Sequence, residues 1–288
     1  MLWQAFRNFQ INRAAARAER DLLAQVKARW EDPPATSQHG LGAEVIVSLT
    51  SHAKRFPTLI NTLRCLLAQT VQPDRVILWL APADEQLLPD AVRDVIGTRA
   101  FEIRITPDSG SYKKLIPALA QFPSAYIATA DDDVFYPANW LEGLIAACSP
   151  LQRQIVCYRA HGMTFRHGVP EAYGQWDYEA NAFDGTVLVP TGVAGILYAP
   201  HALPATAGDA ETFMAICPKA DDIWFAWMGH LAGSEYVKIG KSHTPHSWRG
   251  SQKTGLHVHN VMGGGNDRQI AAMVARFGTI RQGRYVIR

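Results

Sequence analysis

Four short segments with strand patterns, separated by segments with helical periodicity, constrain the fold of this 288-residue chain more than any other feature. Residues 43–49, 75–80 and 125–129 are mostly apolar, whereas apolar and charged residues alternate at 101–105. The helical patterns lie between them, at 55–69, 85–96 and 112–121. Parallel strands need a crossover connection, which is usually a helix, so this alternation is typical of βαβ units. The sequence therefore predicts an α/β fold: a Rossmann-related, mostly parallel sheet flanked by helices.

The second half of the chain has a less regular pattern, so we expect an irregular C-terminal half. Its periodicity predicts helices at 138–148, 221–231 and 267–277 and strands near 154–158 and 186–189. Pro33 and Pro34 close an N-terminal helical pattern. We therefore divide the chain into an N-terminal amphipathic helix (1–32), a linker (33–42), a main domain (43–260) and a C-terminal helix and tail (261–288).

Composition excludes several classes of protein. The 28 Lys and Arg nearly balance the 26 Asp and Glu, which argues against a nucleic-acid partner. Four widely spaced cysteines without a C-x-x-C pair suggest neither a disulfide framework nor a zinc ribbon, so we expect a cytoplasmic protein. The N-terminus lacks the apolar core of a signal peptide, and prolines interrupt the longest uncharged stretch, 185–208, so no membrane-spanning helix is expected.

Polar residues follow the predicted strands, at the edge of the sheet where ligands of such folds bind. Thr50 and Ser51 follow the first strand, Asp84 comes shortly after the second, and Asp131–Asp133 follow the fourth. Neither G-x-G-x-x-G nor G-x-x-x-x-G-K-[ST] is present, so the common dinucleotide and P-loop devices are excluded. A nucleotide would have to bind by another arrangement.

The aspartate triplet is the strongest single indication of chemistry. Three adjacent carboxylates repel one another unless a cation is present. In extended chain, alternate side chains share a face, so Asp131 and Asp133 should converge on one point while Asp132 faces away. Two carboxylates suit Mn²⁺ or Mg²⁺. The alternative is a solvated acidic turn before the helix at 138–148.

A second acidic pair, Asp221-Asp222, begins the helix at 221–231. One interpretation is helix capping or first-turn charge. The other is that one of the two is a general base, with a pKa raised by the apolar surroundings of Trp224 and Trp227. We favour Asp222 slightly over Asp221, and Trp224 would also offer a surface for sugar stacking.

Two lysines, Lys113 and Lys114, stand where the first turn of a helix normally favours acidic residues. A bound diphosphate would supply the missing negative charge, although solvated lysines remain an alternative. Gly192 and Gly195 allow the backbone to approach a ligand closely, or they simply form a turn.

Four segments together resemble bacterial GT-A glycosyltransferases of the family-2 type, which act on capsule, lipopolysaccharide or other surface glycans. These segments are VSLTSHAKRFPTLINTLRCLLAQTVQPDRVILWL (47–80), the aspartate triplet, TGVAGILY (191–198) and ADDIW (220–224). The resemblance covers roughly residues 43–250. It implies a nucleotide-sugar half (43–136) and an acceptor half (137–260).

The resemblance also implies roles for individual residues. Asp131 and Asp133 would hold the cation on the donor diphosphate, and His246, from the late group His243, His246, His257 and His259, would complete its shell. The alternative for these four residues is that they are solvated loop histidines. The donor would contact Thr50, Ser51, Arg55, Asp84, Lys113, Lys114, Asp131 and Asp132. Gly195 and Trp224 would contact the acceptor, with Asp222 or Asp221 as the base. Apart from the resemblance, the basic residues Lys253, Arg249 and Arg268 around GGGND (263–267) suggest a flexible phosphate lid.

The expected function is metal-dependent, inverting transfer of a sugar from a nucleotide-sugar, with a UDP-sugar as first choice. The acceptor would be a hydroxyl of a glycan or a lipid-linked molecule in surface polysaccharide synthesis. One alternative is a sugar nucleotidyltransferase, which should carry a Gly-rich loop that the sequence 50–55 lacks. The other is a non-catalytic glycan-binding protein that retains the fold.

The segment 1–32 combines apolar and basic residues, namely Leu2, Trp3, Phe6 and Phe9 with Arg7, Arg13, Arg17 and Arg20. This pattern is typical of a helix lying on an anionic membrane, which would place the protein on the inner face of the membrane. The alternatives are packing on the domain or pairing in a homodimer. We prefer the latter two because an Ala-rich stretch interrupts the apolar stripe.

Overall fold

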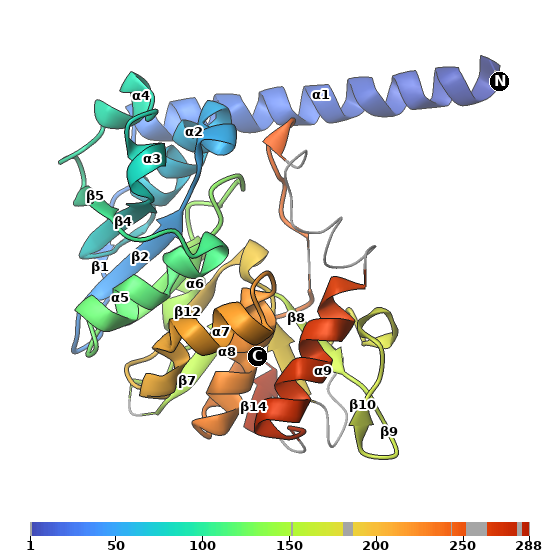
Figure 1. The fold of residues 1–288 in the computed structure, drawn as a ribbon. Coiled ribbons are helices and arrows are strands. Elements are labelled where there is room, and N and C mark those ends of the chain that lie inside the picture. The colour runs from blue at the N-terminus through green and yellow to red at the C-terminus, as the bar shows by residue number, and fades with distance from the viewer. Residues whose placement is uncertain are drawn as a thin grey trace.

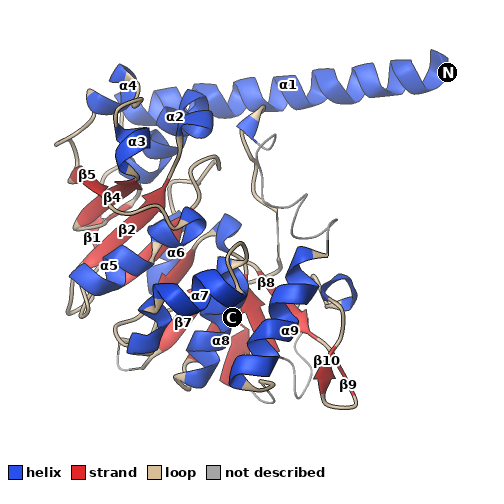
Figure 2. Cartoon of the chain, in the orientation of Figure 1, coloured by secondary structure: helices blue, strands red, loops and turns tan. Residues whose placement is uncertain are grey.

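The computed structural model describes residues 2–150, 152–180, 187–242, 244–251, 264–280 and 284–287. Its centre is an eight-stranded sheet (Figures 1 and 2). The strand order is β14 (Arg284–Ile287), β13 (Glu235–Lys238), β7 (Gln154–Cys157), β12 (Ile196–Tyr198), β6 (Tyr126–Ala130), β2 (Val45–Thr50), β4 (Arg75–Leu80) and β5 (Phe101–Ile105). Neighbours are parallel except at β12, which is antiparallel to β6 and β7. The predicted mostly parallel α/β fold is confirmed.

Helices flank this sheet. They are α2 (Phe56–Leu67), α3 (Pro82–Glu85), α4 (Asp90–Arg93), α5 (Ile116–Gln121), α6 (Trp140–Ala146), α7 (Ala210–Ile216), α8 (Asp221–Leu231) and α9 (Gly265–Phe277). The single helix predicted at 85–96 is instead the two short helices α3 and α4. The reason is Pro89, which is extended at the N-cap of α4 and so breaks the run.

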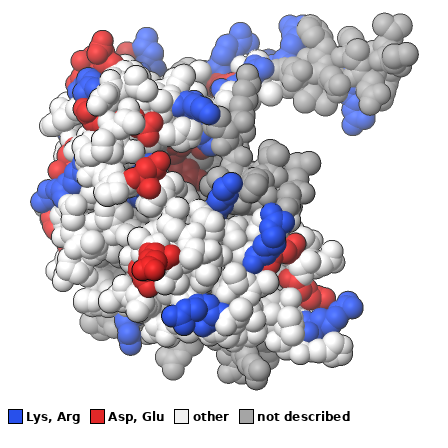
Figure 3. Space-filling view, in the orientation of Figure 1, with Lys and Arg blue, Asp and Glu red and all other residues white. Residues whose placement is uncertain are grey.

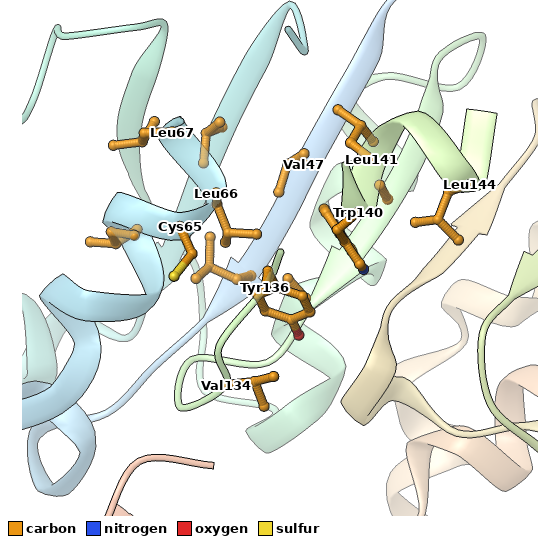
Figure 4. Close-up of a cluster of buried hydrophobic side chains, with 14 of the residues drawn as sticks. Val47, Cys65, Leu66, Leu67, Val134, Tyr136, Trp140, Leu141 and Leu144 are labelled. Carbon is orange, nitrogen blue, oxygen red and sulfur yellow. The ribbon is translucent and has the colours of Figure 1, made fainter. Parts of the chain in front are cut away.

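Alternation along β2 shows how the sheet separates two apolar layers. Val45, Val47 and Leu49 belong to one core cluster, whereas Ile46 belongs to the other. Figure 4 shows the first layer, where Val47 lies among side chains from α2, α6 and the segment after β6. All of β2 except its last residue is buried on both faces, as expected for a central parallel strand.

Three small sheets lie outside the main one. They pair β1 (Ser37–Gln38) with β3 (Val71–Gln72), β8 (Ala160–Met163) with β11 (Val187–Pro190), and β9 (Phe165–Arg166) with β10 (Val169–Pro170). The first pair means that the expected linker at 33–42 is hydrogen-bonded to the domain. The second pair supports the loop that carries Gly192.

The N-terminal helix α1 (Leu2–Glu31) packs on the domain at its C-terminal end and extends away from it at the other (Figure 1). Val26 is buried, and the guanidinium of Arg99 lies 4.1 Å from the ring centroid of Trp30. Nη2 of Arg29 donates to the carbonyl oxygen of Tyr136 at 2.9 Å. No described helix combines the length and apolar character needed to cross a bilayer.

Candidate active site

The aspartate triplet lies in a turn, and its three carboxylates face different partners. The Asp131 carboxylate is 3.1 Å from Nζ of Lys114, and Ser51 Oγ donates to Asp132 Oδ2 at 2.5 Å. Asp133 forms an ion pair with Arg55, and Asp132 Oδ1 lies 3.8 Å from the same guanidinium. The predicted convergence of Asp131 and Asp133 is therefore wrong in this structure. Alternation does not apply because β6 ends at Ala130 and the triplet is not extended.

Burial changes the proton affinity of the middle aspartate. It raises the pKa of Asp132 to about 7, although the hydrogen bond from Ser51 and the charge of Arg55 oppose the rise. The backbone N–H of Asp131 donates to the hydroxyl of Tyr136 at 2.9 Å, which fixes the turn. The triplet is thus a partly buried acidic turn held by Ser51, Arg55 and Tyr136.

Lys114 connects this turn to the second acidic pair. Its Nζ lies 3.1 Å from Asp131 Oδ1 and 3.1 Å from Asp221 Oδ2. Burial lowers the pKa of Lys114, but the attraction of Asp131 and Asp221 outweighs it and holds the pKa well above its usual value. The side chain is therefore a permanent cation. Ser111 Oγ donates to Asp221 Oδ1 at 2.8 Å, so both Asp221 oxygens have partners.

Asp222 has a different environment from its neighbour. Its Oδ1 accepts the N–H of Gly192 at 3.1 Å, at the start of the short 3₁₀ helix Gly192–Ala194. A Cβ at Gly192 would lie 2.7 Å from Lys114 Nζ and 3.2 Å from Asp222 Oδ1, so glycine allows this approach. Burial and the charge of Asp221 raise the pKa of Asp222 to about 7, against the pull of Lys114. This carboxyl can exchange a proton near neutral pH.

The residues expected at the nucleotide lie at the ends of β2 and β4. Thr50 Oγ1 donates to the carbonyl oxygen of Trp79 at 2.8 Å. Asp84 Oδ1 accepts the N–H of Ala53 at 2.9 Å, which joins α3 to the turn after β2. Lys113 turns away from Lys114 and pairs with Asp108 at 2.5 Å, and this pairing lowers the pKa of Asp108. The two neighbouring lysines therefore have separate partners.

The expected cation can be tested against these donors. No three His, Cys, Asp or Glu side chains come together as metal ligands within the described residues. Asp131 offers the more open carboxylate, since its side chain is 30% exposed against 4% for Asp133. His246 Nε2 is buried and makes no hydrogen bond. The carbonyl oxygen of His246 accepts the N–H of Phe135, two residues after Asp133, at 2.9 Å. Carboxylate oxygens and an imidazole nitrogen fit Mn²⁺ or Mg²⁺ chemically, with Arg55 as the competitor at Asp133.

Two residues assigned to the acceptor are structural. Trp224 is fully buried, its Nε1 donates to the carbonyl oxygen of Ala207 at 3.0 Å, and its ring contacts Phe213 and Phe277. The prediction that Trp224 contacts an acceptor is therefore wrong, because the helix face that carries it points into the core. Gly195 has φ of +94°, and a Cβ there would lie 2.5 Å from the ring of Trp140. The close approach at Gly195 is thus to Trp140.

Of the other late residues, His243, His257, His259 and Lys253 lie outside the described residues. Arg249 pairs with Glu19 of α1, and Arg268 lies in α9. Sequence reasoning missed Ser111 and Tyr136, which hold Asp221 and Asp131. Ser111 is two positions before Lys113 and Tyr136 is three positions after Asp133, and that proximity was the available signal.

Charged side chains of both signs are interspersed over the described part of the face shown in Figure 3, in keeping with the net charge of +2. The acidic residues of the site are therefore set apart by burial and by their grouping around Lys114, not by an acidic surface.

No protein-family model matches the chain, and the search of curated proteins found no significant match. Among solved structures, a mannosyltransferase from Pyrobaculum calidifontis in complex with GDP-Man and Mn²⁺ is 15% identical, with a TM-score of 0.48; the alignment covers 94% of this chain and 76% of that one. A 4-diphosphocytidyl-2C-methyl-D-erythritol synthase from Anaerococcus prevotii is 11% identical, with a TM-score of 0.44 and coverage of 77% and 96%. An inositol-1-phosphate CTP transferase from T. maritima is 9% identical, with a TM-score of 0.38 and coverage of 66% and 82%.

Proposed function

We propose that this chain is a GT-A-type glycosyltransferase that moves a sugar from a nucleotide-sugar to a hydroxyl of a glycan or lipid-linked acceptor. The proposal rests above all on one observation. Lys114 joins Asp131, at the end of β6, to Asp221, at the start of α8, so two acidic motifs about 90 residues apart in sequence form one site. Inversion and a place in surface polysaccharide synthesis follow from the sequence resemblance.

The donor would lie over the carboxyl ends of β2, β4 and β6, with its nucleotide near Thr50, Ser51 and Asp84. Its diphosphate would face Arg55, Lys114 and a cation bound at Asp131, the more open carboxylate of the triplet. Such a cation neutralises the negative charge that develops on the departing nucleoside diphosphate. Lys114 is already positioned and charged, so it needs no rearrangement to stabilise that charge.

Asp222 would act as the general base. An acceptor hydroxyl is a weak nucleophile, and a base with a pKa near the working pH is the best compromise between proton affinity and availability. Asp222 meets this condition with a pKa of about 7, and the N–H of Gly192 fixes its carboxylate. Asp221 is less suited because Lys114 and Ser111 occupy its oxygens.

The same acidic group disfavours the alternative of a sugar nucleotidyltransferase. The nucleophile in that reaction is a phosphate oxygen, which is already anionic and needs no base. It would be repelled by the carboxylate of Asp222, which has no cationic partner of its own among the described residues, whereas a neutral hydroxyl would not. The raised pKa of Asp222 favours a catalytic carboxyl over a non-catalytic glycan-binding protein.

A thermal-shift screen tests the proposal. UDP-, GDP- and dTDP-sugars are added with Mn²⁺, with Mg²⁺ or with EDTA, because a ligand that binds the native state alone raises the melting temperature. We expect one nucleotide class to stabilise the chain only with the cation. The donor found in this way is then incubated with simple glycosides, and nucleoside diphosphate release is measured. Release of pyrophosphate from a nucleoside triphosphate and a sugar 1-phosphate would instead identify a nucleotidyltransferase.

A further inference from the structure

An aromatic cluster on β8 lies on the side of the site that carries Asp222, the proposed base. It consists of His161, Tyr173, Trp176 and Tyr178. The ring centroids of His161 and Tyr178 are 4.4 Å apart, and those of Tyr173 and Trp176 are 4.8 Å apart. Trp176 and His161 are each 2% exposed, whereas Tyr178 is 41% exposed. The buried side chains of Trp176 and His161 therefore lie beneath one exposed aromatic ring, that of Tyr178.

The backbone holds this cluster rigidly. Gly162 and Asp177 exchange two hydrogen bonds, at 2.8 and 2.9 Å, which fold the segment of Tyr173 and Tyr178 over β8. Asp267, in the first turn of α9, accepts the N–H of Tyr173 at 2.7 Å. Trp176 Nε1 donates to the carbonyl oxygen of Glu171 at 3.0 Å. An aromatic surface fixed in this way loses little conformational entropy when a ligand covers it.

The cluster is connected to the proposed base through short contacts. Arg159 Nη1 donates to Thr191 Oγ1 at 2.7 Å, and the N–H of Thr191 donates to the carbonyl oxygen of Arg159 at 3.0 Å. The next residue, Gly192, donates to Asp222. The charge of Asp222 also contributes to raising the pKa of the Tyr173 hydroxyl, after burial. The hydroxyl end of Tyr173 is therefore within electrostatic reach of Asp222.

Two features point to a polar ligand at this surface. Both ring nitrogens of His161 are buried without a hydrogen bond, whereas nearly all buried polar groups in native structures have a partner. The charged side chains of Arg159 and Asp177 flank the ring of His161 closely enough to shift its pKa, after burial. The charged side chains beside the ring favour a ligand that carries hydroxyls over an alkyl chain, which would desolvate them without offering hydrogen bonds.

From this arrangement we infer that Tyr178 and Tyr173 form the acceptor subsite, which binds one sugar ring against the face of Tyr178 and directs a hydroxyl toward Asp222. The inference rests on the proposed function and names its acceptor class. A nucleotide base is excluded by position, because the donor residues follow β2, β4 and β6, whereas Arg159 and His161 follow β7 on the far side of β12. The polar face of the sugar remains available to solvent and to Arg159.

The test compares Tyr178→Ala with Tyr178→Phe in the full-length chain. Acceptors are methyl and octyl glycosides of glucose, galactose, mannose and N-acetylglucosamine, with the donor identified by thermal shift. We expect Tyr178→Ala to raise the acceptor KM about tenfold, the scale of one aromatic contact, and Tyr178→Phe to stay within about twofold of wild type. The donor Kd should not change. Leu231→Ala, at an exposed site at the opposite end of α8 from Asp222, is the control.

Saturation-transfer NMR of the methyl glycosides with each variant separates the two proposals. If a methyl glycoside binds to wild type and not to Tyr178→Ala, the subsite is supported. If in addition no nucleotide-sugar binds to wild type, the transferase proposal is rejected and the subsite is not. An unchanged acceptor KM in Tyr178→Ala, with normal donor binding, would overturn the subsite alone. Equal loss of methyl and octyl glycosides indicates a sugar site that serves free and lipid-linked acceptors alike. Loss confined to octyl glycosides would show an alkyl site and overturn the inference.

Discussion

The amide of Gly192 donates a hydrogen bond to Oδ1 of Asp222, whereas the ammonium of Lys114 pairs with Asp221. Two adjacent aspartates are thus held by a neutral donor in one case and by a permanent cation in the other. The carboxyl held by the amide has its pKa raised to about 7 by burial and by its neighbour. This asymmetry gives the two residues separate tasks and makes them distinguishable by substitution.

Asp222→Asn should abolish transfer and leave the fold and the donor Kd intact. The amide oxygen of Asn still accepts the Gly192 N–H, but it cannot take a proton, so kcat should fall by about 10²- to 10⁴-fold. Asp221→Asn should instead lower the melting temperature, because Lys114 loses a buried partner. The assignment is reversed if Asp221→Asn folds normally and is inactive while Asp222→Asn keeps its turnover.

The activity should increase with pH and level off above neutrality. The base works only when deprotonated, and the pKa of Asp222 is about 7, so kcat/KM for the acceptor should fall about tenfold for each pH unit below that value. A flat profile between about pH 5.5 and 8.5, with the chain folded throughout, contradicts a carboxylate base.

Gly192→Ala and Gly195→Ala form a matched pair, three residues apart, that separates the site from the core. The new Cβ of Gly192→Ala would displace Lys114 and Asp222, so activity should be lost with a small change in melting temperature. The Cβ of Gly195→Ala meets the ring of Trp140 in a strained backbone conformation, so this variant should be destabilised by about 2 kcal/mol or more. The opposite pattern would place the functional glycine at Gly195.

Asp131→Asn tests the cation. The side chain is partly exposed, so we expect a folded protein whose stabilisation by nucleoside diphosphate no longer depends on Mn²⁺. Asp133→Ala should also abolish transfer, but it removes the partner of Arg55 as well, and Asp131→Asn is therefore the cleaner variant. Full activity of the wild-type chain in EDTA would remove the cation from the proposal.

Two N-terminal truncations test the roles proposed for α1. Deletion of residues 1–18 should leave the melting temperature within a few degrees of wild type, whereas deletion of 1–32 should lower it strongly. The reason is that Val26, Arg29 and Trp30 pack on the domain, and loss of such core contacts costs several kcal/mol. Vesicles with anionic lipid, and the oligomeric state in solution, then report what residues 1–18 add. Equal melting temperatures for both truncations would contradict the packing role.

The order of strands and helices was predictable where one kind of residue dominates a segment. The strand at 75–80 and the helix at 221–231 coincide with β4 and α8, because one is a continuous buried apolar run and the other follows an acidic first turn. β12 was not predictable. It has three residues, lies between a glycine and a proline-rich stretch, and depends entirely on its neighbours β6 and β7.

The site was predictable as a set of residue types and not as a geometry. Asp131, Asp222 and Lys114 stand out by position in the sequence, but their meeting at one point depends on contacts across the sheet. Asp133 is one example. In an extended chain its carboxylate would lie beside that of Asp131, but the chain turns here and the carboxylate pairs with Arg55. Trp224 illustrates another, since an aromatic residue on a helix is as suitable for a core as for a ligand.

The antiparallel strand β12 has a consequence for how the chain is made. It fills the space between β6 and β7, yet it is synthesised about 40 residues after β7. Until residue 198 has left the ribosome, the edge of β6 that faces β12 is unpaired, and such an edge is prone to association with other chains. The two parts of the sheet on either side of β12 are therefore not separate folding units, because one three-residue strand joins them.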